Sequence, residues 1–187
     1  TPHAEVARSA AVRGAIPALA ELAGSIGDAM VRNQGTIGGS VANADPAADY
    51  PAGLLALGAT VNTDRRSIAA DDFFTGMFET ALQPGELIVS VAFPAAQKAA
   101  YAKFKQPASR FALVGVFVAQ TAGGVRVAAT GCKGSVFRVA ELEAALARSF
   151  TPEAARAVQL PSAGFNADLH ASAEYREQIN ETLGQYD

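Results

Sequence analysis

The residues best suited to bind a ligand lie in one short stretch, Gly35 to Ser40, with the sequence Gly-Thr-Ile-Gly-Gly-Ser. Glycine exposes backbone N–H groups that no side chain shields, and successive N–H groups can form a concave site for an anion. The hydroxyls of Thr36 and Ser40 add further hydrogen-bond donors. Because residues 31–43 are rich in glycine, we expect a loop leading into a short strand rather than a helix. Such a loop can cradle a phosphate group.

The spacing of these glycines differs from the common phosphate-binding patterns. It is neither the G-x-G-x-x-G of a dinucleotide-binding unit nor a P-loop, which has a lysine directly after its last glycine. Taken alone, the glycines are better explained by an ordinary structural turn. Downstream, Asn43 and Asp49 place an amide and a carboxylate where they suit ribose or ribityl hydroxyls. Asp49 can equally be a first-turn carboxylate of a helix, and Asp45 is more simply a helix N-cap.

The composition excludes several classes of function. The chain has 187 residues, a net charge of -3 and a pI near 5.4, so it has no basic surplus with which to bind nucleic acid. Cys132 is the only cysteine, and His3 and His170 are the only histidines, so a metal or iron–sulfur site built mainly from this chain is not expected. Because no apolar run approaches the roughly 20 residues of a membrane span and no leader is recognisable, we expect a cytoplasmic protein.

The hydrophobic pattern indicates an α+β chain made of two units, residues 1–95 and 98–187, with a boundary near Pro94 to Lys98. In the first unit we expect helices at 2–13, at 16–27 and from the Asp45-Pro46 cap to Gly58, a helical turn at 71–78, and strands at 59–63 and 86–93. In the second we expect strands at 101–105, 113–121 and 125–130, the last two joined as a hairpin through Gly123-Gly124, and helices at 139–148, 152–158 and 172–184.

The run from Arg32 to Asp49, Arg-Asn-Gln-Gly-Thr-Ile-Gly-Gly-Ser-Val-Ala-Asn-Ala-Asp-Pro-Ala-Ala-Asp, resembles the second FAD-binding motif of the xanthine dehydrogenase and carbon monoxide dehydrogenase medium-subunit family, the molybdenum hydroxylases. The resemblance continues through residues 71–74, 85–88 and 101–106 and covers nearly the whole chain. It implies that residues 1–95 form the second lobe of a PCMH-type FAD-binding domain. Residues 98–187 would then form a small C-terminal α+β domain like that of the carbon monoxide dehydrogenase flavoprotein. The first lobe of the family, with its Ala-Gly-Gly-type loop, has no counterpart here.

The resemblance also implies a role for individual residues, and in each case that role is binding of FAD. Near the diphosphate and sugar it places the glycine stretch and two polar residues, namely Thr36, Ile37, Gly38, Gly39, Ser40, Asn43 and Asp49. Near the isoalloxazine or adenine it places Ile88 and Lys105. A lysine beside the flavin ring would favour the electron-rich reduced form, although a solvent-facing strand lysine is the alternative. Tyr101 is more simply an ordinary strand aromatic.

The implied activity is that of an oxidoreductase working as part of a multi-subunit complex. The molybdenum cofactor would lie on a large subunit and two [2Fe-2S] clusters on a small subunit, in a dimer of heterotrimers, and FAD would pass their electrons to an external acceptor. Because the flavin performs the redox chemistry, we nominate no acid, base or nucleophile, and we expect this chain alone to be inactive. Two alternatives are a fragment of a PCMH-type flavin oxidase that binds its own substrate, and a non-catalytic module for subunit assembly.

Overall fold

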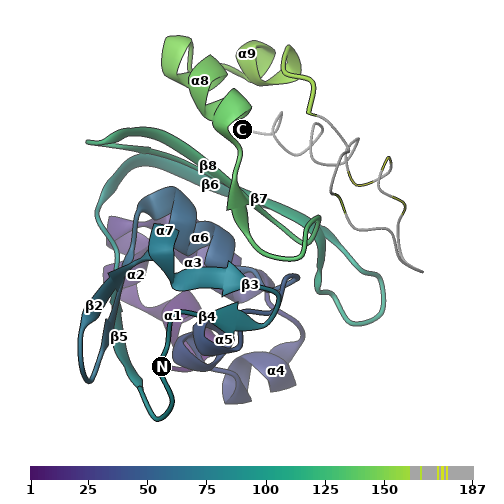
Figure 1. The fold of residues 1–187 in the computed structure, drawn as a ribbon. Coiled ribbons are helices and arrows are strands. Elements are labelled where there is room, and N and C mark those ends of the chain that lie inside the picture. The colour runs from purple at the N-terminus through teal and green to yellow at the C-terminus, as the bar shows by residue number, and fades with distance from the viewer. Residues whose placement is uncertain (161–164, 166–171, 173, 175, 177–187) are drawn as a thin grey trace.

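The computed structural model describes residues 1–160 together with residues 165, 172, 174 and 176. A four-stranded antiparallel sheet crosses the middle of the molecule, with helices on both of its faces (Figure 1). The strands of this sheet are β6 (Ala96–Lys105), β7 (Ala112–Thr121), β8 (Gly124–Thr130) and β9 (Phe137–Arg138), in that spatial order. The mixture of helices and strands confirms the predicted α+β class.

The first part of the chain is mainly helical. Its helices are α1 (His3–Arg8), α2 (Ala10–Ala15), α3 (Pro17–Ser25), α4 (Ala29–Gln34), α5 (Ile37–Asn43) and α6 (Tyr50–Leu57). The single helix predicted at 2–13 is wrong, because the chain breaks at Ser9 and begins a new helix there. The Ser9 hydroxyl accepts a hydrogen bond from the Val12 amide (3.4 Å), which is the geometry of a serine that caps a helix rather than continues one.

The prediction of a loop and strand over residues 31–43 is also wrong, because α4 runs to Gln34 and α5 begins at Ile37, within the glycine stretch itself. Thr36 is extended and caps α5, since its hydroxyl accepts from the Gly39 amide (3.0 Å) and its carbonyl from the Ser40 amide (3.0 Å). Each glycine weakens a helix by about 1 kcal/mol relative to alanine. The cap and the complete burial of Val41 in the core offset this penalty.

In the segment between α5 and α6, Asp45 does not cap the following helix as the sequence predicts. The Asp45 carboxylate accepts from the Ala47 amide (2.9 Å) and so closes a turn, whereas α6 begins only after Asp49. The predicted end of this helix at Gly58 is confirmed, with φ of 65° in the left-handed region.

A small three-stranded sheet and a hairpin follow. The sheet has the order β2 (Ser67–Ala69), β1 (Thr60–Thr63), β5 (Ile88–Ala92), and the hairpin pairs β3 (Phe74–Gly76) with β4 (Glu79–Thr80). The strands predicted at 59–63 and 86–93 are therefore confirmed. The helical turn predicted at 71–78 is only partly correct, because α7 (Ala70–Phe73) ends where the hairpin begins.

The central sheet contains the three strands that the sequence predicts, although β6 begins at Ala96 instead of Tyr101 and β9 is an additional strand. β7 and β8 pair with Thr121 opposite Gly124, so the hairpin lies where the two glycines predicted it. Helices α8 (Ala140–Arg148) and α9 (Pro152–Arg156) correspond to the helices expected at 139–148 and 152–158. The helix expected at 172–184 lies for the most part outside the described residues.

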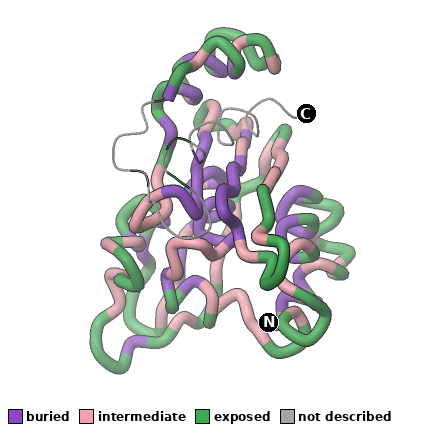
Figure 2. Tube along the Cα trace, turned by 90° about the vertical axis from the view of Figure 1, so that its right-hand side faces the viewer, coloured by how far each residue is buried: buried purple, intermediate pink, exposed green. Residues whose placement is uncertain are grey.

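The hydrophobic core occupies both faces of the central sheet (Figure 2). On one face Phe117 of β7 packs in a cluster with residues of α3 and α6. On the other face Val114 and Val116 pack against Leu142 of α8. Burial on both faces explains why β7 is an almost continuous apolar run rather than an alternating one. The larger cluster contains residues from both sides of the boundary expected near residue 95.

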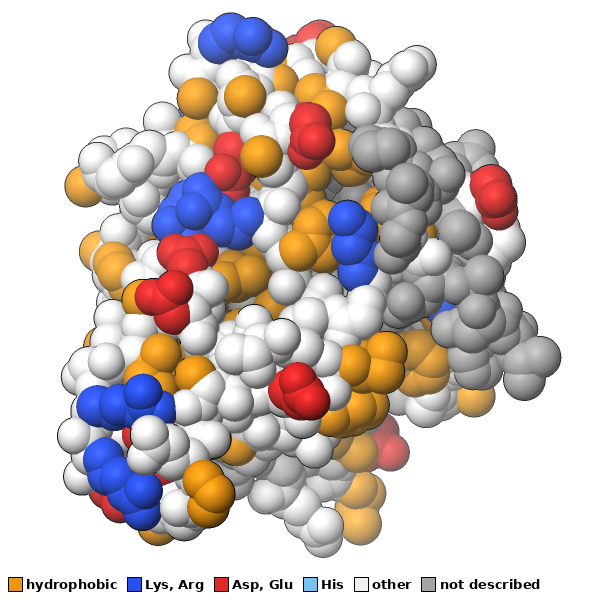
Figure 3. Space-filling view, viewed as in Figure 1, with side chains coloured by type: hydrophobic (Ala, Val, Ile, Leu, Met, Phe, Trp, Pro, Cys, Tyr) orange, Lys and Arg blue, Asp and Glu red, His pale blue; other side chains and the backbone are white. Residues whose placement is uncertain are grey.

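In the part of the chain that the structure describes, none of the helices combines the length and apolar character that a membrane span requires. On the face shown in Figure 3, most basic side chains lie beside acidic ones instead of gathering into one patch. Among the ion pairs of the described residues, the Arg126 guanidinium lies 2.7 Å from the Asp71 carboxylate.

Candidate cofactor-binding site

The start of α5 does not present the row of free amides expected from a glycine loop. The Ile37 amide donates to the Thr1 carbonyl (3.0 Å), and the Gly39 amide donates to the Thr36 hydroxyl. No described residue accepts a hydrogen bond from the Gly38 amide, and a Cβ added at Gly38 would meet no atom within 4 Å. The backbone at Gly38 is therefore open to an approaching ligand, which is the access that a diphosphate needs.

This turn lines a hollow of about 660 Å³, which we call the first hollow. Its other walls come from α1, from α2, and from β5 with the segment that leads into it, where Leu87 and Val89 are 67% and 69% exposed. Of the predicted FAD residues it gathers Thr36, Ile37, Gly38, Gly39 and Ile88. The structure thus brings Ile88 beside the glycine turn, although the two are about fifty residues apart in the chain.

A second hollow, of about 400 Å³, lies next to the same helix. It is lined by Ser40 and Asp49 and by residues 109–111, in the loop that connects β6 to β7. Asn43 and Lys105 line neither of these hollows, and both are exposed, at the last positions of α5 and β6. The predicted FAD-binding residues therefore separate into one group at the first hollow and one at the second, whereas Asn43 and Lys105 lie at neither.

Asp49 is the most constrained of the predicted residues. Its carboxylate accepts a hydrogen bond from the Tyr101 hydroxyl (2.5 Å), and Lys103 Nζ lies 2.8 Å from Oδ1 and 3.0 Å from Oδ2. Burial beside the negative charge of Asp49 raises the pKa of Tyr101 well above its usual value, so the phenol stays protonated and donates. The resemblance placed Lys105 near the isoalloxazine or adenine, and the structure shows that a second lysine of the same strand, Lys103, contacts Asp49. The period-two alternation of a strand predicts residues 101, 103 and 105 on one face, so it does not single out Lys103, and the strand register shifts between Phe104 and Lys105.

Two further titratable side chains lie behind Asp49. His3 and Tyr50 are both buried, with ring centroids 5.3 Å apart, and no described residue bonds to His3 Nδ1 or to the Tyr50 hydroxyl. Burial lowers the pKa of His3, although the charge of Asp49 acts in the opposite direction. Gly35 makes room for the imidazole, because a Cβ there would lie 2.6 Å from His3 Nε2. The glycine that opens the motif thus has a packing role.

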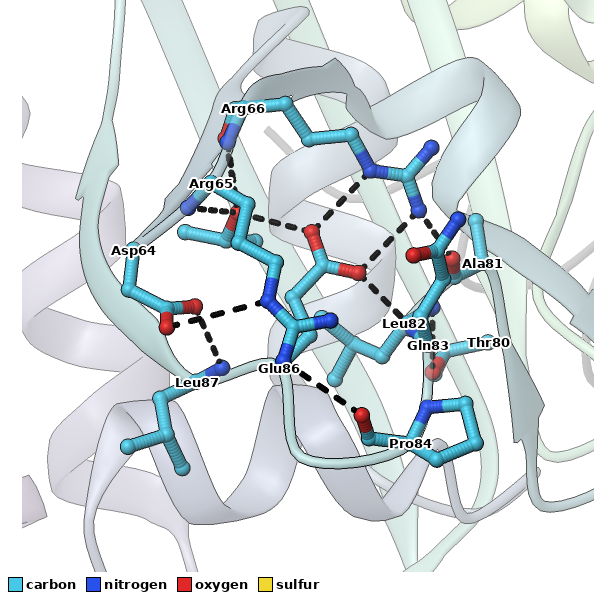
Figure 4. A network of polar contacts seen from close by, with 11 residues as sticks. Asp64, Arg65, Arg66, Thr80, Ala81, Leu82, Gln83, Pro84, Glu86 and Leu87 are labelled. Atoms are coloured by element: carbon cyan, nitrogen blue, oxygen red, sulfur yellow. Dashed lines mark hydrogen bonds and ion pairs between the residues drawn. The ribbon is translucent and has the colours of Figure 1, made fainter.

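The side of the first hollow next to β5 is fixed by a buried carboxylate, Glu86 (Figure 4). Arg66 donates to both of its oxygens (3.0 and 3.1 Å), and the Thr63 hydroxyl and the Gln83 amide donate as well (both 2.8 Å). These hydrogen bonds, that of Arg66 first, lower the pKa of Glu86 to about 2. The network ties the start of β5 to the turn before β2, and so holds Ile88 in place.

Among the described residues, no three or more His, Cys, Asp or Glu side chains are grouped so that they could hold a metal ion. Cys132 is buried, and burial raises the pKa of its thiol to about 11, which leaves the protonated, unreactive form dominant at neutral pH.

Residues 1–96 match the family of FAD-binding domains in molybdopterin dehydrogenases. The chain is 34% identical over 195 residues to the nicotine 6-hydroxylase medium subunit of Paenarthrobacter nicotinovorans, which covers 97% of this chain and 69% of that subunit. It is 35% identical over 154 residues to the glyceraldehyde dehydrogenase medium chain of Sulfolobus acidocaldarius, covering 76% of this chain and 55% of the relative. Carbon monoxide dehydrogenase from Hydrogenophaga pseudoflava, solved without the Mo-pyranopterin moiety, matches with a TM-score of 0.85 and 32% identity over 99% of this chain and 70% of that one.

These similarities confirm the resemblance drawn from the Arg32–Asp49 motif, together with FAD as the cofactor and an oxidoreductase complex as the setting. They give no support to a separate flavin oxidase or to an assembly module. The open backbone at Gly38 beside a hollow of about 660 Å³ fits such a cofactor. The chain therefore belongs to the family of FAD-binding medium subunits of the molybdenum hydroxylases.

Proposed function

We propose that this chain binds FAD across the start of α5, with one end of the dinucleotide in the first hollow and the other in the second. The division of the predicted residues carries this proposal, because residues 36–39 and Ile88 line the first hollow, whereas Ser40 and Asp49 line the second. FAD has a diphosphate in its middle and a ring system at each end. Two hollows that share one glycine-containing helix suit that shape.

The chemistry of the two hollows suggests which end each one takes. The isoalloxazine carries both N–H and carbonyl groups, which need acceptors and donors as partners. The first hollow has an apolar wall at the segment 87–89, together with polar residues such as Glu5 and Ser90. The second hollow is lined by Asp49, Ser40 and Arg110, residues that can supply both acceptors and donors. We therefore assign adenine to the first hollow and the isoalloxazine to the second, while Asn43 and Lys105 stay predicted contacts.

When bound, FAD supplies the electron-transfer chemistry, and the protein supplies position and electrostatics. Gly38 leaves the backbone accessible to the diphosphate, and Thr36 holds the helix end in shape through its hydrogen bond to Gly39. Asp49 and Arg110 line the second hollow, and the Asp49 carboxylate is paired with the Lys103 ammonium. None of these residues is proposed to act as an acid, base or nucleophile.

The role proposed for the chain is transfer of electrons to an external acceptor inside a larger complex. Relatives named as medium subunits and medium chains support this role. The proposal places the molybdenum cofactor on a large subunit and two [2Fe-2S] clusters on a small one, in a dimer of heterotrimers. A cytoplasmic location stays a prediction.

Substitution of Gly38 by valine tests where the diphosphate binds. In the intact complex we expect Gly38→Val to lower the FAD released on denaturation at least tenfold, because the added side chain enters the space the ligand needs. Gly14→Val is the matched control, since that helical glycine also has no atom within 4 Å of an added Cβ and does not line either hollow. Equal flavin content in the two variants would contradict the assignment. Absence of FAD from the unsubstituted complex would contradict the function itself.

A further inference from the structure

We propose that Tyr101 and Lys103 are positioning residues that present Asp49 to the flavin as one half of a buried, neutral ion pair. The inference rests on the proposed function, because it concerns the wall of the second hollow, which Asp49 lines. It assigns to these two strand residues a role that the FAD motif around residues 32–49 does not include.

The contacts around Asp49 leave its carboxylate little freedom. The side chains of Lys103 and Asp49 are 1% and 6% exposed, and the ammonium lies within 3.0 Å of both carboxylate oxygens. The Tyr101 hydroxyl adds a donor to Oδ1. A buried carboxylate without such partners would be strongly unfavourable, so the pair forms as a unit.

The central sheet is built to place both partners. Tyr101 and Lys103 lie two residues apart on β6 and therefore share one face of the strand. Gly115 on β7 lies directly opposite Lys103, and a Cβ there would come within 2.5 Å of the Tyr101 hydroxyl. The Tyr101 ring stacks on Phe117 with centroids 5.9 Å apart. A glycine at position 115 is what allows the phenol to reach across to Asp49.

The pairing matters for a redox cofactor because reduction adds negative charge to the flavin. An unpaired carboxylate in the same hollow would repel that charge and favour the oxidised form, and the repulsion is large where water is excluded. The Lys103 ammonium cancels the charge of Asp49 within 3.0 Å. The ion pair thus offers the flavin a polar contact without lowering its reduction potential.

The test is the midpoint potential of FAD in the intact complex. We expect Lys103→Met to move the two-electron reduction equilibrium at least tenfold toward the oxidised flavin, which is about 30 mV more negative. Asp49→Asn leaves the Lys103 ammonium without its carboxylate partner and should move the equilibrium toward the reduced flavin. The double variant removes both charges and should return to the value of the unsubstituted protein. Lys98→Met is the matched control, because Lys98 is an exposed lysine of the same strand.

Tyr101→Phe separates positioning from charge, since it removes one hydrogen bond and no charge. We expect severalfold weaker retention of FAD with a smaller change of potential than Lys103→Met causes. If Lys103→Met does not fold, the double variant of Lys103 and Asp49 still tests the proposal. A reduction equilibrium of FAD in that variant more than tenfold away from that of the unsubstituted protein would overturn it. A potential in Lys103→Met equal to that in Lys98→Met would overturn it as well. Failure of the proposed function looks different, because the unsubstituted complex would then contain no FAD at all.

Discussion

Glu86 shows how a single buried side chain can fix one wall of a binding site. Its carboxylate is fully enclosed and is bonded by Arg66, Thr63 and Gln83, which come from two separate turns. These bonds favour the charged form, and they hold the segment that carries Ile88 against the first hollow. The sequence showed Glu86 only as the beginning of a strand, because its partners are brought to it by the fold.

The lowered pKa of Glu86 predicts a pH-dependent effect of Glu86→Gln. The folded pKa is about 2 and lies below the unfolded value, so the charged form stabilises the protein above about pH 4.5, and this stabilisation is lost as the pH falls toward 2. We expect Glu86→Gln to lower the urea midpoint at pH 7, with a difference that shrinks steadily below pH 4.5. Glu21→Gln, at an exposed position of α3, is the control. A difference that is independent of pH would show that the carboxylate charge is not the cause.

Helix α5 shows how a local cap can overrule composition. Its sequence, Ile-Gly-Gly-Ser-Val-Ala-Asn, contains two adjacent glycines and predicts a loop. The helix forms because Thr36 caps its first turn and because Val41 is completely buried. The glycines then serve for access at Gly38 and not for a left-handed turn.

The cap predicts that Thr36→Ala destabilises the protein by about 1 kcal/mol, because the Gly39 amide loses its acceptor. Thr36→Ser keeps the hydroxyl and should stay close to the unsubstituted protein. Thermal unfolding measures both variants, and FAD retention in the complex should fall in parallel with the loss of the cap. If the alanine and serine variants unfold at the same temperature, the hydroxyl does not act as a cap.

The molecule as a whole is joined across the boundary that the sequence suggested near residue 95. Arg126 of β8 donates to both oxygens of Asp71 (2.7 Å each) and to the carbonyl of Leu55 in α6 (2.8 Å). Phe117 of β7 lies in the same hydrophobic cluster as α6. The ion pair between Asp49 and Lys103 is a third link between the two parts.

The Arg126 contact predicts the effect of a conservative change. Lysine keeps the charge but cannot form the forked hydrogen bonds, so Arg126→Lys should lower the free energy of unfolding by about 1 kcal/mol, a modest value because Asp71 is partly exposed. Arg156→Lys is the control, since its ion pair with Glu153 is long (3.9 Å) and exposed. Urea unfolding measures the difference. Equal stability of the two variants would mean that this contact contributes nothing across the boundary.

The sequence by itself determined the α+β class, the hairpin at residues 123–124 and membership in an FAD-binding family, because each of these depends on local pattern or on one contiguous motif. Only the tertiary structure decided that residues 37–43 are helical, since the complete burial of Val41 adds to the local Thr36 cap and the two together outweigh the preference of the glycines. It also decided that Asp49 pairs with Lys103, which is 54 residues away. Contacts over such separations depend on how strands and helices pack, and no local spacing encodes them.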